Sequence, residues 1–282
     1  MVESVLEKTM GFREVVIVYK PSRECLELMR RYMDTLRSHG IRVDTIWVDE
    51  VGRGDLDTYD LIIAMGGDGT LLRISWSLCR RRPLILPVPC GRRTVLYEDI
   101  ACIKPDTIIE KVLRGEFFID RLERIKAVIN NREYYALNEV ALISQDSGRV
   151  LHIDVSIETP FNKTVYRLES DGVLVSTPTG SSAYCLSARG PLVETLLSNI
   201  ILVPLNPVTL NTAPLILHPF SQVVVRVHDY TNAYVDGKRV DTLAPDSIAL
   251  FRLSNSFLRI IRISRRRDLV KSVLGKRITL FL

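Results

Sequence analysis

The sequence predicts an α/β fold followed by an all-β part, and three observations carry this prediction. In the N-terminal part, continuous apolar runs alternate with segments whose apolar residues recur every three or four positions. From about residue 116 onward, short alternating runs separated by turn residues replace that pattern. The length of 282 residues also suits two domains. We therefore expect an open, mostly parallel α/β domain over 1–115 and a β-sandwich-like domain over 116–264.

The elements of the first domain follow from the spacing of apolar residues. Strands are expected at 14–19, 41–48, 60–65 and 84–88, with helices from Cys25 to Leu36 and from Thr70 to about Arg82. The run 60–65 has no polar alternation, which is typical of a strand covered on both faces. Gly40 supplies the end of the first helix. Strands alternating with helices in this way predict a mostly parallel sheet.

The second domain is expected to consist of short strands. These are predicted at 134–143, 151–158, 163–168, 223–228, 247–253 and 257–263, with one helical segment at 187–198. A final helix is expected in the tail 265–282, which opens with three arginines. That tail either returns to the first domain or is a solvated helix end.

Composition and charge exclude several classes of protein. Hydrophobic residues make up 46% and charged residues 25%, which excludes wholesale disorder and fibrous repeats. Neither a long apolar run nor a signal-peptide pattern occurs, so we expect a cytoplasmic protein without a membrane partner. The net charge of +5 and the pI near 9.0 suit an anionic ligand without demanding nucleic acid, and no nucleic-acid partner is expected.

The cysteines and histidines predict neither disulfides nor a metal centre. The five cysteines are an odd number and include no C-x-x-C pair, so we expect reduced packing thiols. The four histidines show no ligand spacing, so no protein metal site is expected. The cysteines are Cys25, Cys79, Cys90, Cys102 and Cys185, and the histidines are His39, His152, His218 and His228.

A glycine-rich turn is the most informative local feature. It reads Gly66, Gly67, Asp68, Gly69, Thr70, and it follows a buried strand and opens a helix. Glycines let backbone N–H groups approach an anion, and a helix N-terminus favours negative charge. Asp68 is then a candidate to accept a proton from an attacking hydroxyl, or to contact the metal of a nucleotide. The alternative is a tight turn in which Asp68 only caps the helix.

Two further segments carry polar groups in apolar surroundings. Asn138 and Glu139 interrupt an apolar strand, and an amide with a carboxylate suits a vicinal diol such as a ribose. Solvent exposure is the alternative for this pair. The segment 169–187 runs from a strand into a hydroxyl-rich loop and then Ala183-Tyr184, which suits a base edge and its ring. A Ser/Thr turn with helix caps is the alternative there.

Taken in this order, the three segments resemble the NAD kinase family, and the chain looks like a divergent, archaeal-like member. The resemblance implies the α/β and β-sandwich partition, and an enzyme that phosphorylates the adenosine ribose 2′-hydroxyl of NAD to give NADP. ATP or polyphosphate is the implied donor, with Mg²⁺ or another divalent cation carried by ATP. A homo-oligomer, dimer or tetramer, is also implied.

The resemblance also implies roles for individual residues. Asp68 would be the general base, with Gly66, Gly67, Gly69 and Thr70 in the nucleotide-binding turn. Asn138 and Glu139 would hold a ribose hydroxyl pair on the nicotinamide side. The dinucleotide pocket, chiefly around the adenine, would be lined by Asp171, Thr179, Ser182, Ala183, Tyr184 and Ser187.

Two segments depart from the family pattern. The stretch 87–96 has prolines where the family has a glycine-rich loop with Asn and Phe, and Arg189 replaces a glycine. Arg92 and Arg93 lie just beyond the strand 84–88, where they either contact phosphates or are solvated surface residues. Two other functions therefore stay open: a nucleotide-binding sensor that has lost catalysis, and a GGDG-type kinase of a lipid or sugar hydroxyl.

Overall fold

The computed structural model describes residues 11–78, 82–90, 94–100, 102–146, 148–209 and 212–263. These residues form two compact units. The first unit comprises the described residues up to Leu122 together with those from Phe257 onward, and the second runs from Glu123 to Ser256. Arg92, Arg93 and the tail 265–282 lie outside the described residues.

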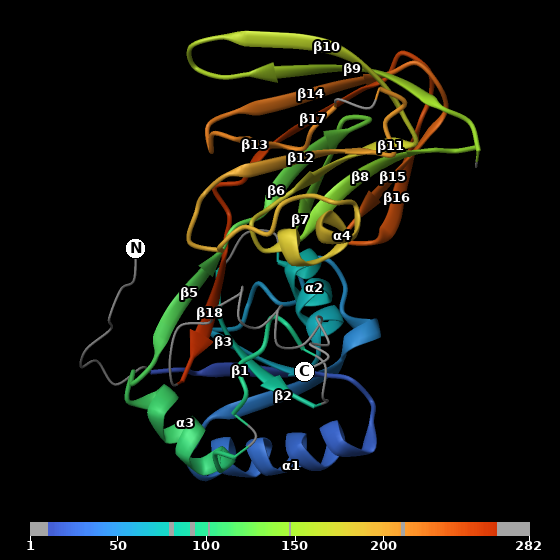
Figure 1. Ribbon diagram of the computed structural model, residues 1–282. Helices are drawn as coiled ribbons and strands as arrows, with labels where there is room; N and C mark the ends of the chain where they lie inside the picture. The colour runs from blue at the N-terminus through green and yellow to red at the C-terminus, as the bar shows by residue number, and fades with distance from the viewer. Residues whose placement is uncertain are drawn as a thin grey trace, which may run out of the picture. The chain divides into compact units, whose positions relative to one another are not determined.

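A six-stranded sheet organises the first unit (Figure 1). In spatial order it consists of β2 (Arg42–Trp47), β1 (Glu14–Tyr19), β3 (Leu61–Gly66), β4 (Leu84–Pro89), β18 (Leu258–Arg262) and β5 (Phe118–Leu122). Neighbours from β2 to β18 pair in parallel, and only β5 is antiparallel. The mostly parallel sheet expected from the sequence is confirmed.

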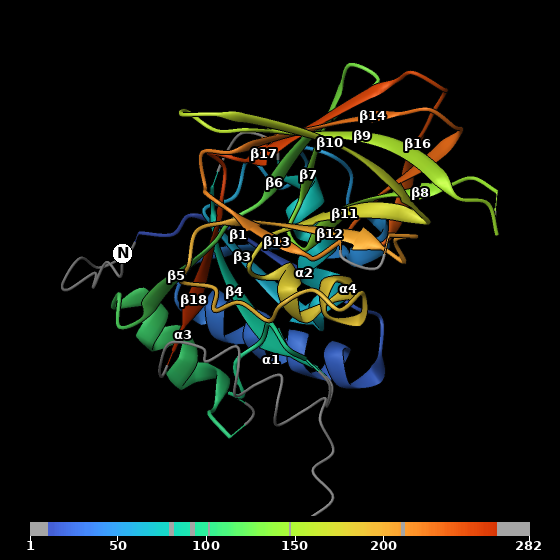
Figure 2. The ribbon, with the colours of Figure 1, turned by 45° about the horizontal axis from the view of Figure 1, so that its top comes forward.

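Helices form on this sheet where the sequence supplies caps and apolar faces. α1 (Arg23–Ser38) begins at Ser22, whose hydroxyl accepts the Cys25 N–H at 3.3 Å. α3 (Pro105–Leu113) begins with a proline, which needs no N–H partner there. Both helices pack into one core with alternate residues of β1, β3 and β4, and Figure 2 shows them together. α2 (Asp68–Ser77) follows β3, and η1 (Val48–Glu50) follows β2.

Two strands from distant parts of the chain complete the first sheet. β18 pairs with β4 only at Leu84 and Ile85, so Pro87 lies where β4 has a partner on one side alone. Phe117, Ile119 and Ile261 then join the core of β1 and β3. From the sequence, the segments of β5 and β18 are expected in the β-rich domain, because nothing local in either one reveals its partner.

A buried ion pair fastens these two strands. Arg262 in β18 is 0% exposed, and its Nη2 lies 3.1 Å from Asp120 Oδ2 in β5. Its Nη1 also donates to the Leu96 carbonyl oxygen at 2.9 Å. A buried cation is tolerated only with such partners. The pair therefore joins β18, β5 and the segment around Leu96.

The second unit contains two antiparallel sheets, which Figures 1 and 2 show as separate layers, and the expected β-sandwich is confirmed. One consists of β10 (Lys163–Ser170), β9 (Leu151–Glu158), β14 (Gln222–Val227), β17 (Ile248–Leu253), β6 (Ile125–Ile129) and β7 (Arg132–Ala136). The other consists of β13 (Leu215–Leu217), β12 (Ile200–Leu205), β11 (Gly172–Ser176), β8 (Glu139–Ser144), β15 (Thr231–Val235) and β16 (Lys238–Leu243). η2 (Gly180–Ser182) and α4 (Tyr184–Ser187) follow β11.

Two local predictions for this unit were wrong. The segment 134–143 is not one strand, because the chain leaves the first sheet after β7 and enters the second at β8. The expected helix 187–198 does not form either. Arg189 has a positive φ of 63°, and Pro191 disfavours helical backbone at the residue before it, so α4 ends at Ser187.

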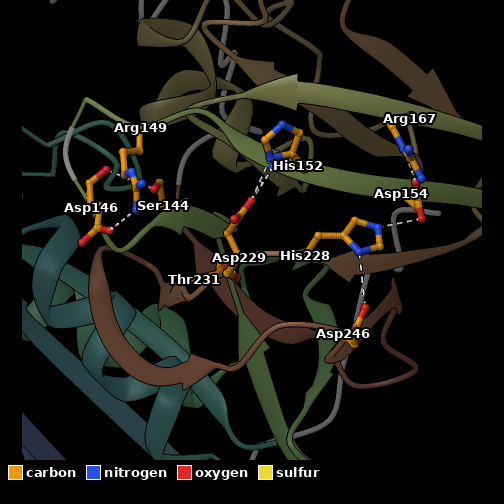
Figure 3. A network of polar contacts seen from close by, with 10 residues as sticks. All are labelled: Ser144, Asp146, Arg149, His152, Asp154, Arg167, His228, Asp229, Thr231 and Asp246. Atoms are coloured by element: carbon orange, nitrogen blue, oxygen red, sulfur yellow. Dashed lines mark hydrogen bonds and ion pairs between the residues drawn. The ribbon is translucent and has the colours of Figure 1, made fainter.

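An exposed polar network lies on β9, β10 and the loops beside them (Figure 3). Asp154 accepts from Arg167 at 3.0 Å and contacts the His228 ring at 2.8 Å. Arg167 first, and His228 second, lower the pKa of Asp154. Surface pairs of this kind contribute little to stability, because water screens them.

Among the described helices, none is long and apolar enough to cross a membrane.

The two kinds of ion pair give a stability prediction. Arg262→Ala leaves the Asp120 carboxylate buried without its cation, so we expect a loss of about 3–5 kcal/mol in the free energy of unfolding. Arg167→Ala removes an exposed partner and should cost no more than about 1 kcal/mol. Urea unfolding at neutral pH measures both. Equal losses for the two variants would show that the Arg262 pair contributes no more than a surface pair.

Candidate functional site

The glycine turn after β3 is built around the close approach of Thr70. Gly66 ends β3, Gly67 is the N-cap of α2, and Asp68 is the first helical residue. A Cβ at Gly66 would lie 2.2 Å from the Thr70 hydroxyl oxygen, so only glycine fits there. A Cβ at Gly69 would meet no atom within 4 Å, and Gly69 is exposed. The open side of the turn is therefore at Gly69, where a ligand can approach backbone.

The Asp68 carboxylate holds the loop that follows β4 and does not cap its own helix. No side chain caps α2. Instead Asp68 Oδ2 accepts the Val95 N–H at 2.9 Å, and Oδ1 accepts the Leu96 N–H at 2.9 Å and the Val95 N–H at 3.1 Å. A carboxylate accepts about four hydrogen bonds, so the half-buried group keeps capacity for another donor, chiefly at Oδ2.

The loop that Asp68 holds is itself anchored in the core of the first unit. Val95, Leu96 and Tyr97 are buried, and Arg262 donates to the Leu96 carbonyl oxygen. Burial raises the pKa of Tyr97 well above its ordinary value, and the charge of Asp68 adds to the shift. The buried Tyr97 hydroxyl has no hydrogen-bond partner among the described residues. Asp68 is thus fixed from the helix side and from the loop side.

In the second unit, Asp236 fixes the Asn138-Glu139 segment. Its carboxylate accepts the N–H groups of Leu137 at 3.0 Å, Asn138 at 2.7 Å and Glu139 at 3.2 Å. Asp236 has a positive φ of 46° in the turn between β15 and β16. Asp-Gly is the preferred pair for such a hairpin turn. No role for the Asp236 carboxylate was expected from the sequence.

Glu139 is a buried acid with an unused oxygen. It is 6% exposed, and its Oε2 has no partner in the described part of the chain. Burial first, and the charge of Asp236 second, raise the pKa of Glu139 from 4.5 to about 8 against the opposing effect of a hydrogen bond from the Tyr184 N–H. The expectation of solvent exposure is wrong for this residue. Its contact with Tyr184 joins the Asn138-Glu139 segment to the segment 169–187.

The hydroxyl-rich loop after β11 uses much of its polarity internally. The Thr177 hydroxyl donates to the Leu137 carbonyl oxygen at 2.6 Å, and the Ser182 hydroxyl donates to the Thr179 carbonyl oxygen at 3.2 Å. A Cβ at Gly180 would lie 2.1 Å from the Asn138 carbonyl oxygen. Close packing of this loop on the Asn138 backbone therefore requires glycine at 180, and leaves Thr179 and Ser182 buried.

A cavity of about 700 Å³ lies beside this loop in the second unit. Its lining includes three of the predicted residues, Asp171, Tyr184 and Ser187. The predicted residues that do not line it are Asn138, Glu139, Thr179, Ser182 and Ala183. The volume lies within the range of small-molecule sites.

Two cavity residues escaped the site prediction. Arg189 and Asn206 both line the cavity and both have positive φ, 63° and 45°. Such strain at non-glycine residues is concentrated at functional sites. Asn206 donates to Asp171 Oδ2 at 2.8 Å and so orients that carboxylate. Arg189 had been noted only as a departure from the family, and no local pattern marks Asn206.

The described residues contain no cluster of side chains that could hold a metal ion. No three His, Cys, Asp or Glu side chains come together there in a way that would hold an ion. Histidine pairs with carboxylates do occur, but on the surface network of Figure 3.

The buried acid gives a pH-dependent stability prediction. Because the pKa of Glu139 is raised on folding, its proton stabilises the folded state fully below pH 4.5, and this stabilisation is lost as the pH rises to about 8. Glutamine does not titrate, so the Glu139→Gln variant does not lose this stabilisation as the pH rises. The unfolding free energy of the variant minus that of wild type should therefore increase between pH 5 and 8, by about 1.4 kcal/mol per pH unit at most. Urea unfolding without ligand measures it.

The exposed Glu133 is the matched control for this experiment. Its pKa is lowered, chiefly by Lys126, so Glu133 is ionised throughout this range. The difference in unfolding free energy between Glu133→Gln and wild type should therefore stay constant between pH 5 and 8. A constant difference between Glu139→Gln and wild type over that range would contradict a raised pKa at Glu139.

Comparison with known proteins supports one family over most of the chain. Residues 1–117 match the family model for the ATP-NAD kinase N-terminal domain, and residues 137–263 match that for the C-terminal domain. An NAD kinase of Caldicellulosiruptor bescii is 33% identical over 210 residues, covering 74% of this chain and 78% of that protein. An NAD kinase of Pyrococcus furiosus is 33% identical over 248 residues, covering 82% and 87%.

A solved structure shares the fold. The crystal structure of an NAD kinase from Archaeoglobus fulgidus in complex with ATP has a TM-score of 0.77 at 24% identity, covering 92% of this chain and 98% of that one. The order of the three sequence segments, the two matched domains and the identities to curated relatives all agree. On these grounds the chain belongs to the NAD kinase family.

Proposed function

We propose that the protein transfers the γ-phosphoryl group of ATP to the 2′-hydroxyl of the adenosine ribose of NAD, giving NADP. The observation that carries the proposal is the Asp68 carboxylate, held on two backbone N–H groups at the open end of a glycine turn. The ATP-bound relative from Archaeoglobus supports ATP as donor, since its fold is shared. Polyphosphate is the alternative donor.

In the proposed mechanism Asp68 is the general base. The 2′-hydroxyl oxygen attacks the γ-phosphorus, its proton passes to Asp68, and ADP leaves. The Val95 and Leu96 N–H groups fix the carboxylate, so little reorganisation accompanies the proton transfer. Gly66, Gly67, Gly69 and Thr70 form the turn at the N-terminus of α2, which favours phosphate. Mg²⁺ carried with ATP would neutralise phosphate charge.

The second unit is proposed to bind the dinucleotide. Tyr184 is 42% exposed and lines the cavity, so its ring is open to stack on an adenine. Asp171 and Ser187 supply polar groups at the same cavity. The unused Oε2 of Glu139, with Asn138 beside it, suits a ribose hydroxyl pair. Thr179, Ser182 and Ala183 are proposed to shape the loop that carries Tyr184.

One assay separates the proposal from its alternatives. The purified protein is incubated with NAD, ATP and Mg²⁺, and nucleotides are resolved by chromatography. NADP formation supports the kinase, whereas NAD binding without turnover would indicate a sensor. Parallel reactions with polyphosphate, a diacylglycerol and a hexose test the other donor and acceptors. An intact Asp68 on a built turn favours catalysis over a sensor.

Several expectations stay predictions. Phosphate contacts by Arg92 and Arg93 fall outside the described residues. A homo-oligomer, cytoplasmic location and a requirement for Mg²⁺ also belong to the proposal. Size-exclusion chromatography with light scattering tests the oligomer.

The catalytic assignment predicts the behaviour of Asp68→Asn. The amide keeps the size of the side chain but accepts no proton, so kcat should fall by about 10²-fold or more while the affinity for NAD changes little. Steady-state kinetics and calorimetry measure the two effects. Asp34→Asn, on the exposed side of α1, is the matched control. Activity of Asp68→Asn within threefold of wild type would reduce Asp68 to a residue that holds the Val95-Leu96 loop.

The binding assignment predicts losses of affinity at Tyr184 and Glu139. Tyr184→Ala removes a stacking surface and should raise the Kd for NAD about three- to tenfold. Glu139→Ala removes a ribose hydrogen bond and should raise it about tenfold or more. Tyr230→Ala, an exposed tyrosine away from the cavity, is the control for calorimetry. Unchanged affinity in both folded variants would mean that the pocket is assigned wrongly.

A further inference from the structure

Two cysteines flank the carboxyl end of β3, directly before the glycine turn. Cys25 lies in the first turn of α1, and Cys90 follows β4. The backbone brings both to one place, because β3 lies between β1 and β4. Cys25 Sγ lies 4.0 Å from the Met65 carbonyl oxygen, and the Cys90 N–H donates to the Gly66 carbonyl oxygen at 3.0 Å.

Each of the two thiols is the largest influence on the pKa of the other, and the two differ in accessibility. Cys25 is 0% exposed, whereas Cys90 is half-buried. Cys90 also lines a cavity of about 330 Å³, whose other lining residues are Glu24, Glu27, Leu28, Arg31 and Pro89. A small reagent can therefore reach Cys90, whereas Cys25 is enclosed.

The surroundings of Cys25 favour a thiolate. The hydrogen bond from Cys90, one from Ser22 and the charge of Lys20 lower the pKa of Cys25, while burial opposes them. The same contact raises the pKa of Cys90. Reactive cysteines are typical of the first turn of a helix. Cys185 differs, because burial raises its pKa to about 12.

We propose that Cys25 and Cys90 are a modification site, which closes to an intramolecular disulfide when the protein meets a peroxide. In the first step the Cys90 proton passes to the Cys25 thiolate, the Cys90 thiolate so formed attacks hydrogen peroxide, the O–O bond breaks, and hydroxide leaves. Cys90 is then a sulfenic acid. In the second step the Cys25 sulfur attacks the Cys90 sulfur, the S–O bond breaks, and the hydroxyl leaves with the Cys25 proton as water. Both sulfurs are oxidised, and the peroxide is reduced by two electrons.

The crosslink has a consequence for the proposed active site. A disulfide draws the two sulfurs to about 2.05 Å, well inside the contact distance of two unbonded sulfurs, and we expect the segment that carries Cys90 to shift. Cys90 is bonded to Gly66, two residues before Asp68, and the loop after it carries Val95 and Leu96. A displacement of about 1 Å at a reacting group costs about 10²-fold in rate. This consequence rests on the proposed role of Asp68, whereas the crosslink does not.

The test treats the whole chain with hydrogen peroxide and maps the crosslink directly. Wild type, Cys90→Ser and Cys102→Ser are oxidised, digested without reduction and analysed by mass spectrometry, and kcat/KM is measured before oxidation, after it and after dithiothreitol. We expect a Cys25–Cys90 peptide and a loss of kcat/KM of tenfold or more, both reversed by dithiothreitol. Cys102→Ser, which lacks only an exposed thiol, should behave like wild type. Cys90→Ser should form no such peptide and should keep its activity.

Several results would overturn the proposal. One is the absence of the Cys25–Cys90 peptide from oxidised wild type, and another is a crosslink that uses Cys79 or Cys102 instead. Crosslinked protein with unchanged kcat/KM would remove the coupling to Asp68 while the modification site stands. Because mass spectrometry does not depend on turnover, failure of the proposed kinase function is distinguishable from failure of the site.

Discussion

Buried backbone N–H groups outside a sheet need acceptors, and in each unit an aspartate supplies them in a segment that is proposed to bind substrate. Asp68 takes the N–H groups of Val95 and Leu96, and Asp236 takes those of Leu137, Asn138 and Glu139. An unsatisfied buried N–H costs about 1–3 kcal/mol, so each carboxylate fixes its loop strongly. The geometry of both proposed binding segments follows from these bonds.

In the first unit this constraint makes one side chain serve two purposes. The carboxylate that is proposed to take the proton also holds the loop after β4 in place. The loop is held in turn by Arg262, whose charge is balanced by Asp120 on a neighbouring strand. The position of the base therefore depends on strands from both ends of the chain. Pro87 in place of a glycine of the family pattern is compatible with that anchoring, because β4 lacks a partner on one side there.

Local sequence patterns predicted the features that depend on local chemistry. The buried run before the glycine turn and the strand at 151–158 could be predicted because hydrophobic periodicity is a local property. The place of β18 beside β4 could not, since parallel pairing between segments so distant leaves no trace in either one. The roles of Asp236 and Asn206 were also missed, because each side chain contacts a segment that is distant in the sequence. The contact of Glu139 with Tyr184 depends on how two strands and a loop pack, which spacing does not encode.

In the second unit, Glu139 is buried in surroundings that disfavour its charge, and the proposed ligand would supply the missing hydrogen bond. Glu139 is buried with one oxygen unpaired, and burial together with the charge of Asp236 favours its protonated form. Where a buried position has no functional role, an apolar residue of similar volume makes the protein more stable than a buried acid does. A ribose hydroxyl pair would satisfy the free oxygen, and the ligand would then stabilise the folded state by mass action. In the proposed binding mode, the hydrogen bonds that Glu139 can make with the ribose change with its protonation, so dinucleotide binding would be linked to proton binding at this residue.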